Sequence, residues 1–269
     1  MQIAGGTSAF KEAERSGWSE KAPVYDDFAG RITAGAVEAL LDAVALEADM
    51  AFLDICCGTG TLAGAAARRG ADVTGIDFAA PMIDEARRRF PDVAFAGGDA
   101  EALDFPAGAF DAAACAFGLL HLADPDAALR EAHRVLRTGG RYAFTVWAGP
   151  PDHQFFHLVN EAIAAHGAPV ELPPAPPMFR FADARAATAA MEAAGFHDVA
   201  VTTLPLVWTI AGPRDVLAYV EKCTLRVALV LDRQTREARE RIHAAIMEGA
   251  AAFGTEVAWP AVLVAGRKP

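Results

Sequence analysis

A glycine-rich turn is the part of the sequence best suited to hold a ligand. Residues 52–60 read Phe-Leu-Asp-Ile-Cys-Cys-Gly-Thr-Gly, between an apolar run at 51–55 and an alanine-rich stretch at 61–69. This pattern predicts a buried strand, a turn and a helix. Glycines allow close backbone approach to a ligand, and a helix start offers unpaired N–H groups and a positive dipole end. The turn alone does not identify the ligand, because Gly58, Gly60 and Ala63 also satisfy the dinucleotide pattern G-x-G-x-x-G/A.

Three acidic residues stand at or just after the ends of predicted strands. Asp77 ends the second strand, where an acid takes the ribose hydroxyls of many nucleotide ligands, a dinucleotide included. Asp54 ends the first strand, and its carboxylate can approach a ligand ammonium as well as its own turn. Asp99 follows the third strand and can accept from an exocyclic amine such as that of adenine. Asp54 and Asp99 therefore favour a ligand other than a dinucleotide.

Alternating strands and helices must position these residues. Apolar stretches predict five strands in the first half of the chain, at 51–55, 72–77, 93–96, 110–117 and 141–147. We expect helices between them, one opened by Pro81 and one at 127–136 that ends at Thr138-Gly139-Gly140 as a C-cap. This alternation predicts an α/β fold with a parallel sheet covered on both faces. Ligands bind such sheets beyond the carboxyl ends of the strands, where the acids and Phe117 fall.

The flanking regions have a different character. Residues 1–20 predict a loose arm or a short helix at 9–15, and residues 32–46 predict an amphipathic helix. Trp18 and Tyr25 either fix the arm to the core or order it when a ligand binds. Beyond Trp147 the chain predicts further elements: helices at 154–166 and 183–194, a proline-rich linker at 169–177, a long strand at 197–210, two helices within 212–253 and a closing strand at 257–266.

Composition excludes several classes of protein. The chain has 269 residues, 53% of them hydrophobic, and a formal net charge of −11, which argues against nucleic-acid binding. The basic triplet at 87–89 is interpreted as the solvated face of a helix. No apolar run reaches the roughly 20 residues of a membrane span, and the N-terminus lacks a signal-peptide pattern. Four irregularly spaced cysteines indicate a reduced, cytoplasmic protein without a metal site.

At this point the sequence resembles the class I S-adenosylmethionine-dependent methyltransferases, of the type that includes ubiquinone and menaquinone biosynthesis enzymes. Residues 53–60, Leu-Asp-Ile-Cys-Cys-Gly-Thr-Gly, are similar to the family signature L-D-x-G-C-G-T-G. Further signatures are matched in order at 75–82, 98–106, 117–121 and 134–141, so the resemblance covers about residues 50–147. It implies a doubly wound, mostly parallel, seven-stranded Rossmann-like sheet with a helical lid insertion. The implied organisation is a lid at 1–46, a cofactor-binding core at 47–148, and an acceptor-binding region with the end of the sheet at 149–269.

The resemblance also implies a role for each matching residue. Asp54 and the backbone of Cys56 and Gly58 would hold the amino acid end of S-adenosyl-L-methionine, beside Gly60. Asp77 would take both ribose hydroxyls. The remaining cofactor contacts would come from Phe78, Met82, Asp99, Ala100, Phe117 and, as an aromatic lid, Tyr25. Core packing is the alternative role of Phe78 and Met82.

Cys56 departs from the signature, because the family usually has glycine there. We expect this cysteine to need a φ compatible with its Cβ and to narrow the space beside the methionine moiety. It is not expected to act as a nucleophile, because nothing nearby in the sequence would lower a thiol pKa.

The implied activity is methyl transfer to a small, largely apolar or aromatic acceptor, with oxygen favoured over carbon or nitrogen. The alternatives are an enzyme of the same fold that binds the cofactor without transferring methyl, and a nicotinamide-dependent oxidoreductase. His121, just after the fourth strand, is the candidate catalytic base, because imidazole is suited to proton abstraction near neutral pH. Alternatively, it only shapes the pocket or bonds a backbone carbonyl.

Overall fold

A seven-stranded sheet forms the centre of the protein, whose computed structural model describes residues 4–269, with side chains from residue 9 onward. The strand order is β3-β2-β1-β4-β5-β9-β6. Strands β1 to β5 are parallel to one another, and β9 is antiparallel to both β5 and β6. The strands are β1 (Ala51–Ile55), β2 (Asp72–Asp77), β3 (Ala94–Gly97), β4 (Phe110–Ala116), β5 (Leu136–Trp147), β6 (His197–Leu204) and β9 (Ala261–Arg267). The predicted doubly wound, mostly parallel sheet is confirmed.

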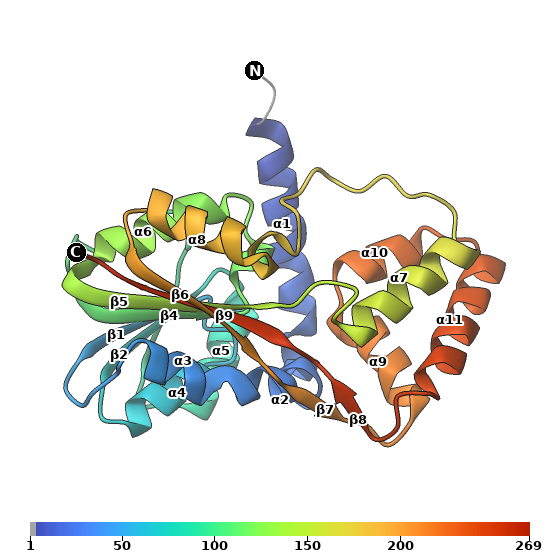
Figure 1. The fold of residues 1–269 in the computed structure, drawn as a ribbon, viewed down its shortest axis with the longest axis horizontal. Helices are drawn as coiled ribbons and strands as arrows, with labels where there is room; N and C mark the ends of the chain where they lie inside the picture. The colour runs from blue at the N-terminus through green and yellow to red at the C-terminus, as the bar shows by residue number, and fades with distance from the viewer. Residues whose placement is uncertain (1–3) are drawn as a thin grey trace.

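Helices cover both faces of this sheet, as Figure 1 shows. Helices α6 (Pro125–Val135) and α8 (Ala184–Ala193) lie on one face, and α3 (Val37–Ala43) and α4 (Thr61–Arg68) lie on the other. The alternation of side chains along β1 produces the two cores: Phe52 packs in the cluster of α3 and α4, whereas Leu53 packs in the cluster that holds Leu129 of α6. Burial on both faces explains the continuous apolar run.

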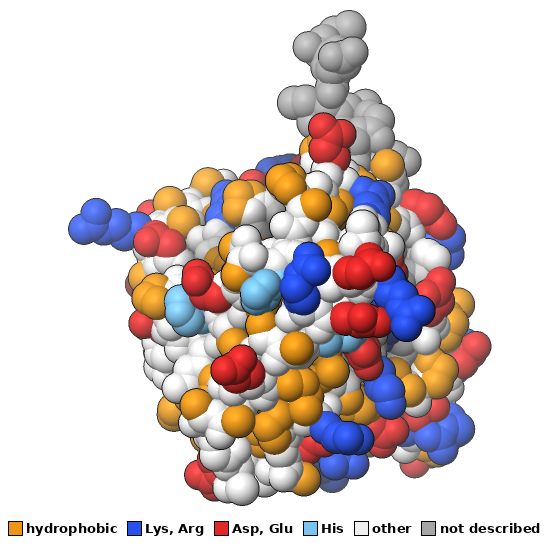
Figure 2. Space-filling view, turned by 90° about the vertical axis from the view of Figure 1, so that its right-hand side faces the viewer, with side chains coloured by type: hydrophobic (Ala, Val, Ile, Leu, Met, Phe, Trp, Pro, Cys, Tyr) orange, Lys and Arg blue, Asp and Glu red, His pale blue; other side chains and the backbone are white. Residues whose placement is uncertain are grey.

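A helical lobe stands beside the sheet, on the right in Figure 1. It contains α7 (Gln154–His166), α9 (Pro213–Cys223), α10 (Arg226–Asp232) and α11 (Arg236–Ala250). Two short strands, β7 (Val207–Thr209) and β8 (Glu256–Ala258), pair with each other and connect the lobe to β6 and β9. The face seen in Figure 2 carries acidic and basic side chains close together, with apolar side chains between them.

The N-terminal region packs against the carboxyl ends of the strands. It consists of the helix α1 (Ala4–Lys21), the 3-10 turn η1 (Ala22–Asp27), α2 (Ala29–Thr33), the 3-10 turn η2 (Ala34–Ala36) and α3. The remaining elements are α5 (Ala80–Arg89), η3 (Leu119–His121) and η4 (Arg180–Ala182). Within the described residues, no helix is long and apolar enough to span a membrane.

Several predicted boundaries are wrong. The arm is one helix, α1, much longer than residues 9–15, and the helix expected at 32–46 is divided into α2, η2 and α3. Thr138-Gly139-Gly140 lies within β5 rather than capping α6, which ends at Val135. Pro205 and Pro260 interrupt the two long strands, because proline lacks the N–H that a ladder needs. Three helices, not two, lie between β7 and β8.

Candidate active site

A cavity of about 330 Å³ opens at the carboxyl ends of the strands. One side is lined by the core, with Gly58, Asp77 and Phe117. The other side is lined mainly by apolar side chains of the lobe and of the segment before α8, among them Phe156, Ile163, Met178, Phe179, Val227 and Val230. The volume lies in the range of small-molecule sites. The cavity therefore joins a polar, glycine-containing wall to an apolar wall.

The glycine-rich turn connects β1 to α4 through two glycines with different environments. Gly58 has a φ of +51°, and a Cβ built there would meet nothing within 4 Å, so this position is open towards the cavity that it lines. Gly60 has a φ of +82°, but a Cβ there would lie 2.8 Å from Phe95. Gly60 is required for packing against the core and is not among the lining residues.

Cys56 lines the cavity with a left-handed backbone, φ +58°. The expectation that its φ would suit a Cβ is wrong, because this region disfavours side chains by roughly 1–2 kcal/mol. Its side chain packs where a Cβ on Gly118 would lie, only 2.4 Å from the Cys56 Cβ. The neighbouring Cys115 thiol and burial together hold the pKa of Cys56 well above its usual range, so its thiol is not activated.

Asp54 is fully buried behind the turn and is not among the lining residues. Its Oδ2 accepts a hydrogen bond of 2.9 Å from the backbone N–H of Ala63 in the first turn of α4. Its Oδ1 is buried and has no hydrogen-bond partner among the described residues. Burial raises the pKa of Asp54 well above its usual value. The Asp54 side chain therefore stabilises the turn, as expected, and its second oxygen accepts no hydrogen bond from the described residues.

Asp77 lines the cavity at the end of β2, and both of its oxygens are oriented by backbone amides. Oδ2 accepts from Gly58 N–H and Oδ1 accepts from Ala79 N–H, each at 2.9 Å. Burial raises the pKa of Asp77, while these amides oppose that effect. The carboxylate is therefore fixed in one orientation beside the open face of Gly58.

The residues expected around adenine line two adjoining cavities. Phe78 and Met82 line the main cavity. Asp99 and Ala100 line a small adjoining cavity that shares Cys56, Asp77, Phe78 and His121 with the main one. Lys11 of α1 forms ion pairs there with Asp99 and with Glu101, the latter at 2.9 Å. No local pattern marks Lys11, because it lies 88 residues before Asp99 in the chain.

Aromatic and charged side chains close the site from α1 and η1. Nδ1 of His121 lies 2.8 Å from Oε2 of Glu14, a carboxylate only 3% exposed that the sequence did not single out. Trp18 packs edge-on against both His121 and Tyr25. Burial raises the pKa of Tyr25 to about 12, and its hydroxyl lies 3.4 Å from that of Thr33. Phe117, with a φ of +57°, stacks on Trp147 at 3.9 Å between ring centroids.

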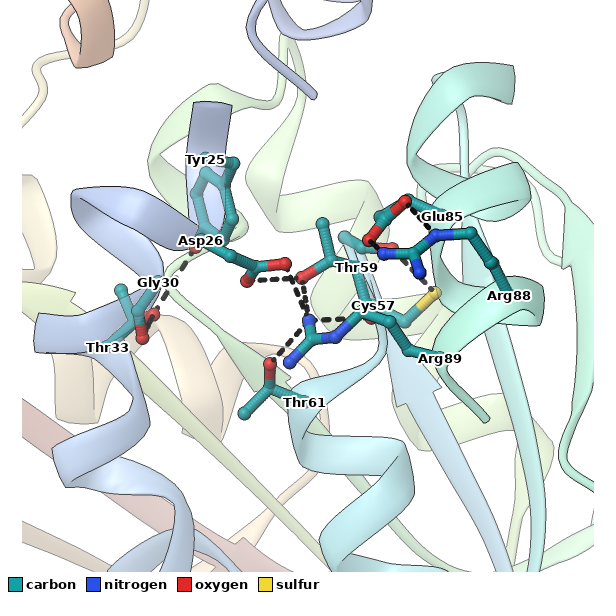
Figure 3. A network of polar contacts seen from close by, with 11 residues as sticks. Tyr25, Asp26, Gly30, Thr33, Cys57, Thr59, Thr61, Glu85, Arg88 and Arg89 are labelled. Atoms are coloured by element: carbon teal, nitrogen blue, oxygen red, sulfur yellow. Dashed lines mark hydrogen bonds and ion pairs between the residues drawn. The ribbon is translucent and has the colours of Figure 1, made fainter. Parts of the chain in front are cut away.

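A polar network ties the N-terminal segment to the glycine-rich turn (Figure 3). Nη1 of Arg89 donates to Asp26 Oδ2 at 2.8 Å and to the Thr59 hydroxyl at 2.7 Å. The Thr59 hydroxyl in turn donates to Asp26 Oδ1 at 2.9 Å. Thr59 is almost fully buried, so these contacts fix the turn against η1 and α5.

The comparisons with known proteins agree with this geometry. A family model described as a methyltransferase domain matches residues 52–140. A demethylmenaquinone methyltransferase of Beutenbergia cavernae is 42% identical over 113 residues, which are 42% of this chain and 47% of the relative. One of Thermus thermophilus is 40% identical over 148 residues, 51% of this chain and 67% of the relative. The chain belongs to the class I S-adenosylmethionine-dependent methyltransferase family.

The chain spans about half the length of the Beutenbergia relative and two thirds of the Thermus one. The YcgJ protein of Bacillus subtilis has the same fold, with a TM-score of 0.58, 20% identity, and coverage of 87% of this chain and 97% of that one.

The residues of this methyltransferase-family chain fit S-adenosyl-L-methionine, the cofactor of the family. Gly58 leaves room where a Cβ would project. Asp77 presents two oriented oxygens, which suits a pair of ribose hydroxyls. The unpartnered Oδ1 of Asp54 is a buried acceptor directly behind the turn. No group of three or more His, Cys, Asp or Glu that could hold a metal occurs among residues 4–269 as described.

Proposed function

We propose that the protein transfers a methyl group from S-adenosyl-L-methionine to a small, apolar or aromatic acceptor of the quinone type. The observation that carries this proposal is the single cavity in which Gly58 and Asp77 face a wall of apolar side chains from the lobe. The names of the two curated relatives point to a quinone-type acceptor. They give no support to the expected preference for oxygen over carbon or nitrogen, or to a protein that binds the cofactor without transferring methyl.

The cofactor residues act by holding and orienting. Asp77 binds the ribose, the backbone of Cys56 and Gly58 binds the amino acid end, and Asp54 orients that turn from behind through its bond to Ala63. Phe78, Met82, Asp99 and Ala100 bind the adenine, after Lys11 releases Asp99. Gly60 acts through the packing of the turn, and Tyr25 and Phe117 enclose the reacting region. Bound in this way, the cofactor supplies a sulfonium methyl group with a good leaving group, so alignment and exclusion of water supply most of the catalysis.

The chain divides this work between three parts. Residues 1–46 close the site as a lid, residues 47–148 hold the cofactor, and residues 149–269 complete the sheet and form the acceptor wall. His121 takes a proton from the acceptor where the acceptor has one to lose. With the Nδ1 proton directed to Glu14, the Nε2 lone pair is the one available to accept it.

The test is a direct assay of both binding and transfer. Calorimetry should show binding of S-adenosyl-L-methionine and none of NAD. Incubation with methyl-labelled cofactor and 1,4-dihydroxynaphthalene, a reduced quinone without a tail, should release S-adenosylhomocysteine and give a labelled product. Asp77→Ala is the control that should lose both signals. Absence of cofactor binding in the wild type would refute the proposal.

A further inference from the structure

A cation lies on the apolar side of the cavity. Arg226, the first residue of α10, lines the cavity among the lobe residues, and its side chain is 24% exposed. Among the described lining residues on that side, it is the one that carries a full charge. An arginine in an apolar wall is costly unless its charge has a partner.

The existing partners of Arg226 leave its charge incompletely matched. Nη1 donates to the Pro176 carbonyl at 3.2 Å, and the guanidinium lies 4.9 Å from the centre of the Phe10 ring. Arg226 forms an ion pair with the buried Glu14, whose Oε1 lies 3.8 Å from Nε, a distance too long for a hydrogen bond. The other Glu14 oxygen already contacts His121.

One nitrogen of this guanidinium, Nη2, is buried and has no hydrogen-bond partner among the described residues. Burial lowers the pKa of Arg226, against the effect of Glu14, yet a guanidinium keeps its proton in proteins. A buried cationic donor of this kind is stabilised most by an anionic oxygen, because such hydrogen bonds are short and strong.

The surroundings define the rest of the ligand. Phe156, Ile163, Met178 and Val230 line the same part of the cavity and offer no charge. We propose that Arg226 binds an ionised oxygen of the acceptor, so that the acceptor is an apolar, ring-containing molecule with an acidic hydroxyl or enol. This inference rests on the proposed function, since it places the acceptor in this cavity.

The experiment compares two probes of nearly equal size. 2-Hydroxy-1,4-naphthoquinone is an anion at neutral pH, whereas 2-methoxy-1,4-naphthoquinone is uncharged. Each is titrated calorimetrically into protein saturated with S-adenosylhomocysteine, using the wild type, Arg226→Gln and Arg233→Gln. Arg233 is the matched control: it is exposed, lies just after α10, and donates to the Glu171 carbonyl of the same proline-rich linker that Arg226 contacts.

The wild type and Arg233→Gln should bind the anion about tenfold or more tightly than the ether. Arg226→Gln should bind the two probes equally and keep the wild-type affinity for S-adenosylhomocysteine. An unchanged preference in Arg226→Gln, or a wild type that binds neither probe, would overturn the inference. Loss of S-adenosylhomocysteine affinity in Arg226→Gln would assign Arg226 to the cofactor and overturn it as well. Failure of the wild type to bind S-adenosylhomocysteine would instead refute the proposed function.

Discussion

Glu14 and His121 are joined by a contact of 2.8 Å between Oε2 and Nδ1, although 107 positions separate them in the chain. Glu14 comes from α1 and His121 from η3, just after β4. A buried carboxylate beside one ring nitrogen holds an imidazole in one orientation and one tautomer. Helix α1 therefore takes part in orienting the candidate base.

If His121 is a base, His121→Ala should lower kcat about a hundredfold with little change in cofactor affinity, because general-base catalysis is worth about that much. Glu14→Gln should lower kcat less, by about tenfold, because the ring stays but its orientation is weakened. Glu12→Gln, an exposed change on α1, is the control. Normal turnover by His121→Ala would leave alignment as the mechanism.

Asp77→Ala should weaken S-adenosylhomocysteine binding by about two orders of magnitude, because two ligand hydroxyls would lose a charged acceptor. It should also lower the melting temperature, because the amides of Gly58 and Ala79 lose their partner. Asp72→Ala, at the exposed other end of β2, should change neither value appreciably. Calorimetry and thermal unfolding measure the two effects. Equal affinities in the two variants would remove Asp77 from the site.

Gly58→Ala and Gly139→Ala form a matched pair. Both glycines have a positive φ and open space at the Cβ position, but only Gly58 lines the cavity. Each change should lower the free energy of unfolding by about 1 kcal/mol, because alanine disfavours this conformation. Only Gly58→Ala should also weaken S-adenosylhomocysteine binding, by about tenfold or more, because its methyl group enters the cavity where the cofactor is proposed to bind. Unimpaired binding by Gly58→Ala would contradict the placement of the cofactor.

His153 should make the fold sensitive to acid. It is fully buried among aromatic rings, neither ring nitrogen has a hydrogen-bond partner among the described residues, and burial lowers its pKa to about 4. Below about pH 6.5 this histidine binds a proton in the unfolded chain but stays neutral in the folded chain. The free energy of unfolding therefore falls as the pH drops from about 6.5 to 4. The loss should approach roughly 3 kcal/mol.

His153→Phe should flatten this part of the profile, because phenylalanine keeps the aromatic packing and does not titrate. Urea unfolding at several pH values measures the free energy of unfolding. His197→Gln, at an exposed histidine, should retain the wild-type slope. A wild-type slope in His153→Phe would show that other groups cause the acid sensitivity.

Local patterns were sufficient to predict the centre of the fold. The bounds of β1 and β2 agree with the predictions. Strand β1 is buried on both faces, so apolar residues dominate its sequence. Helix α7 also has the predicted bounds. The structure brings Cys56, Gly58, Asp77 and Phe117 to one cavity, as the carboxyl-end rule requires.

Contacts between distant segments could not be predicted from local patterns. Helix α1 passes through Gly17, which lies against Leu225, and packing of this kind overrides the low helix propensity of glycine. The contacts of Lys11, Glu14 and Arg226 join residues far apart in the chain, so no spacing in the sequence marks them. The positive φ of Cys56 was missed because cysteine seldom adopts it.

The proline bends at 205 and 260 separate the lobe from the part of the chain that the family model matches. They carry the β7–β8 pair and the lobe away from the sheet, and the family match ends at residue 140, before the lobe begins. The apolar wall of the cavity therefore lies on segments that do not build the glycine-rich turn. If the proposed function holds, substitutions in α7 and α10 should change which acceptors bind while the glycine-rich turn stays constant. Randomised libraries confined to these two helices are accordingly the economical route to enzymes with new acceptor ranges.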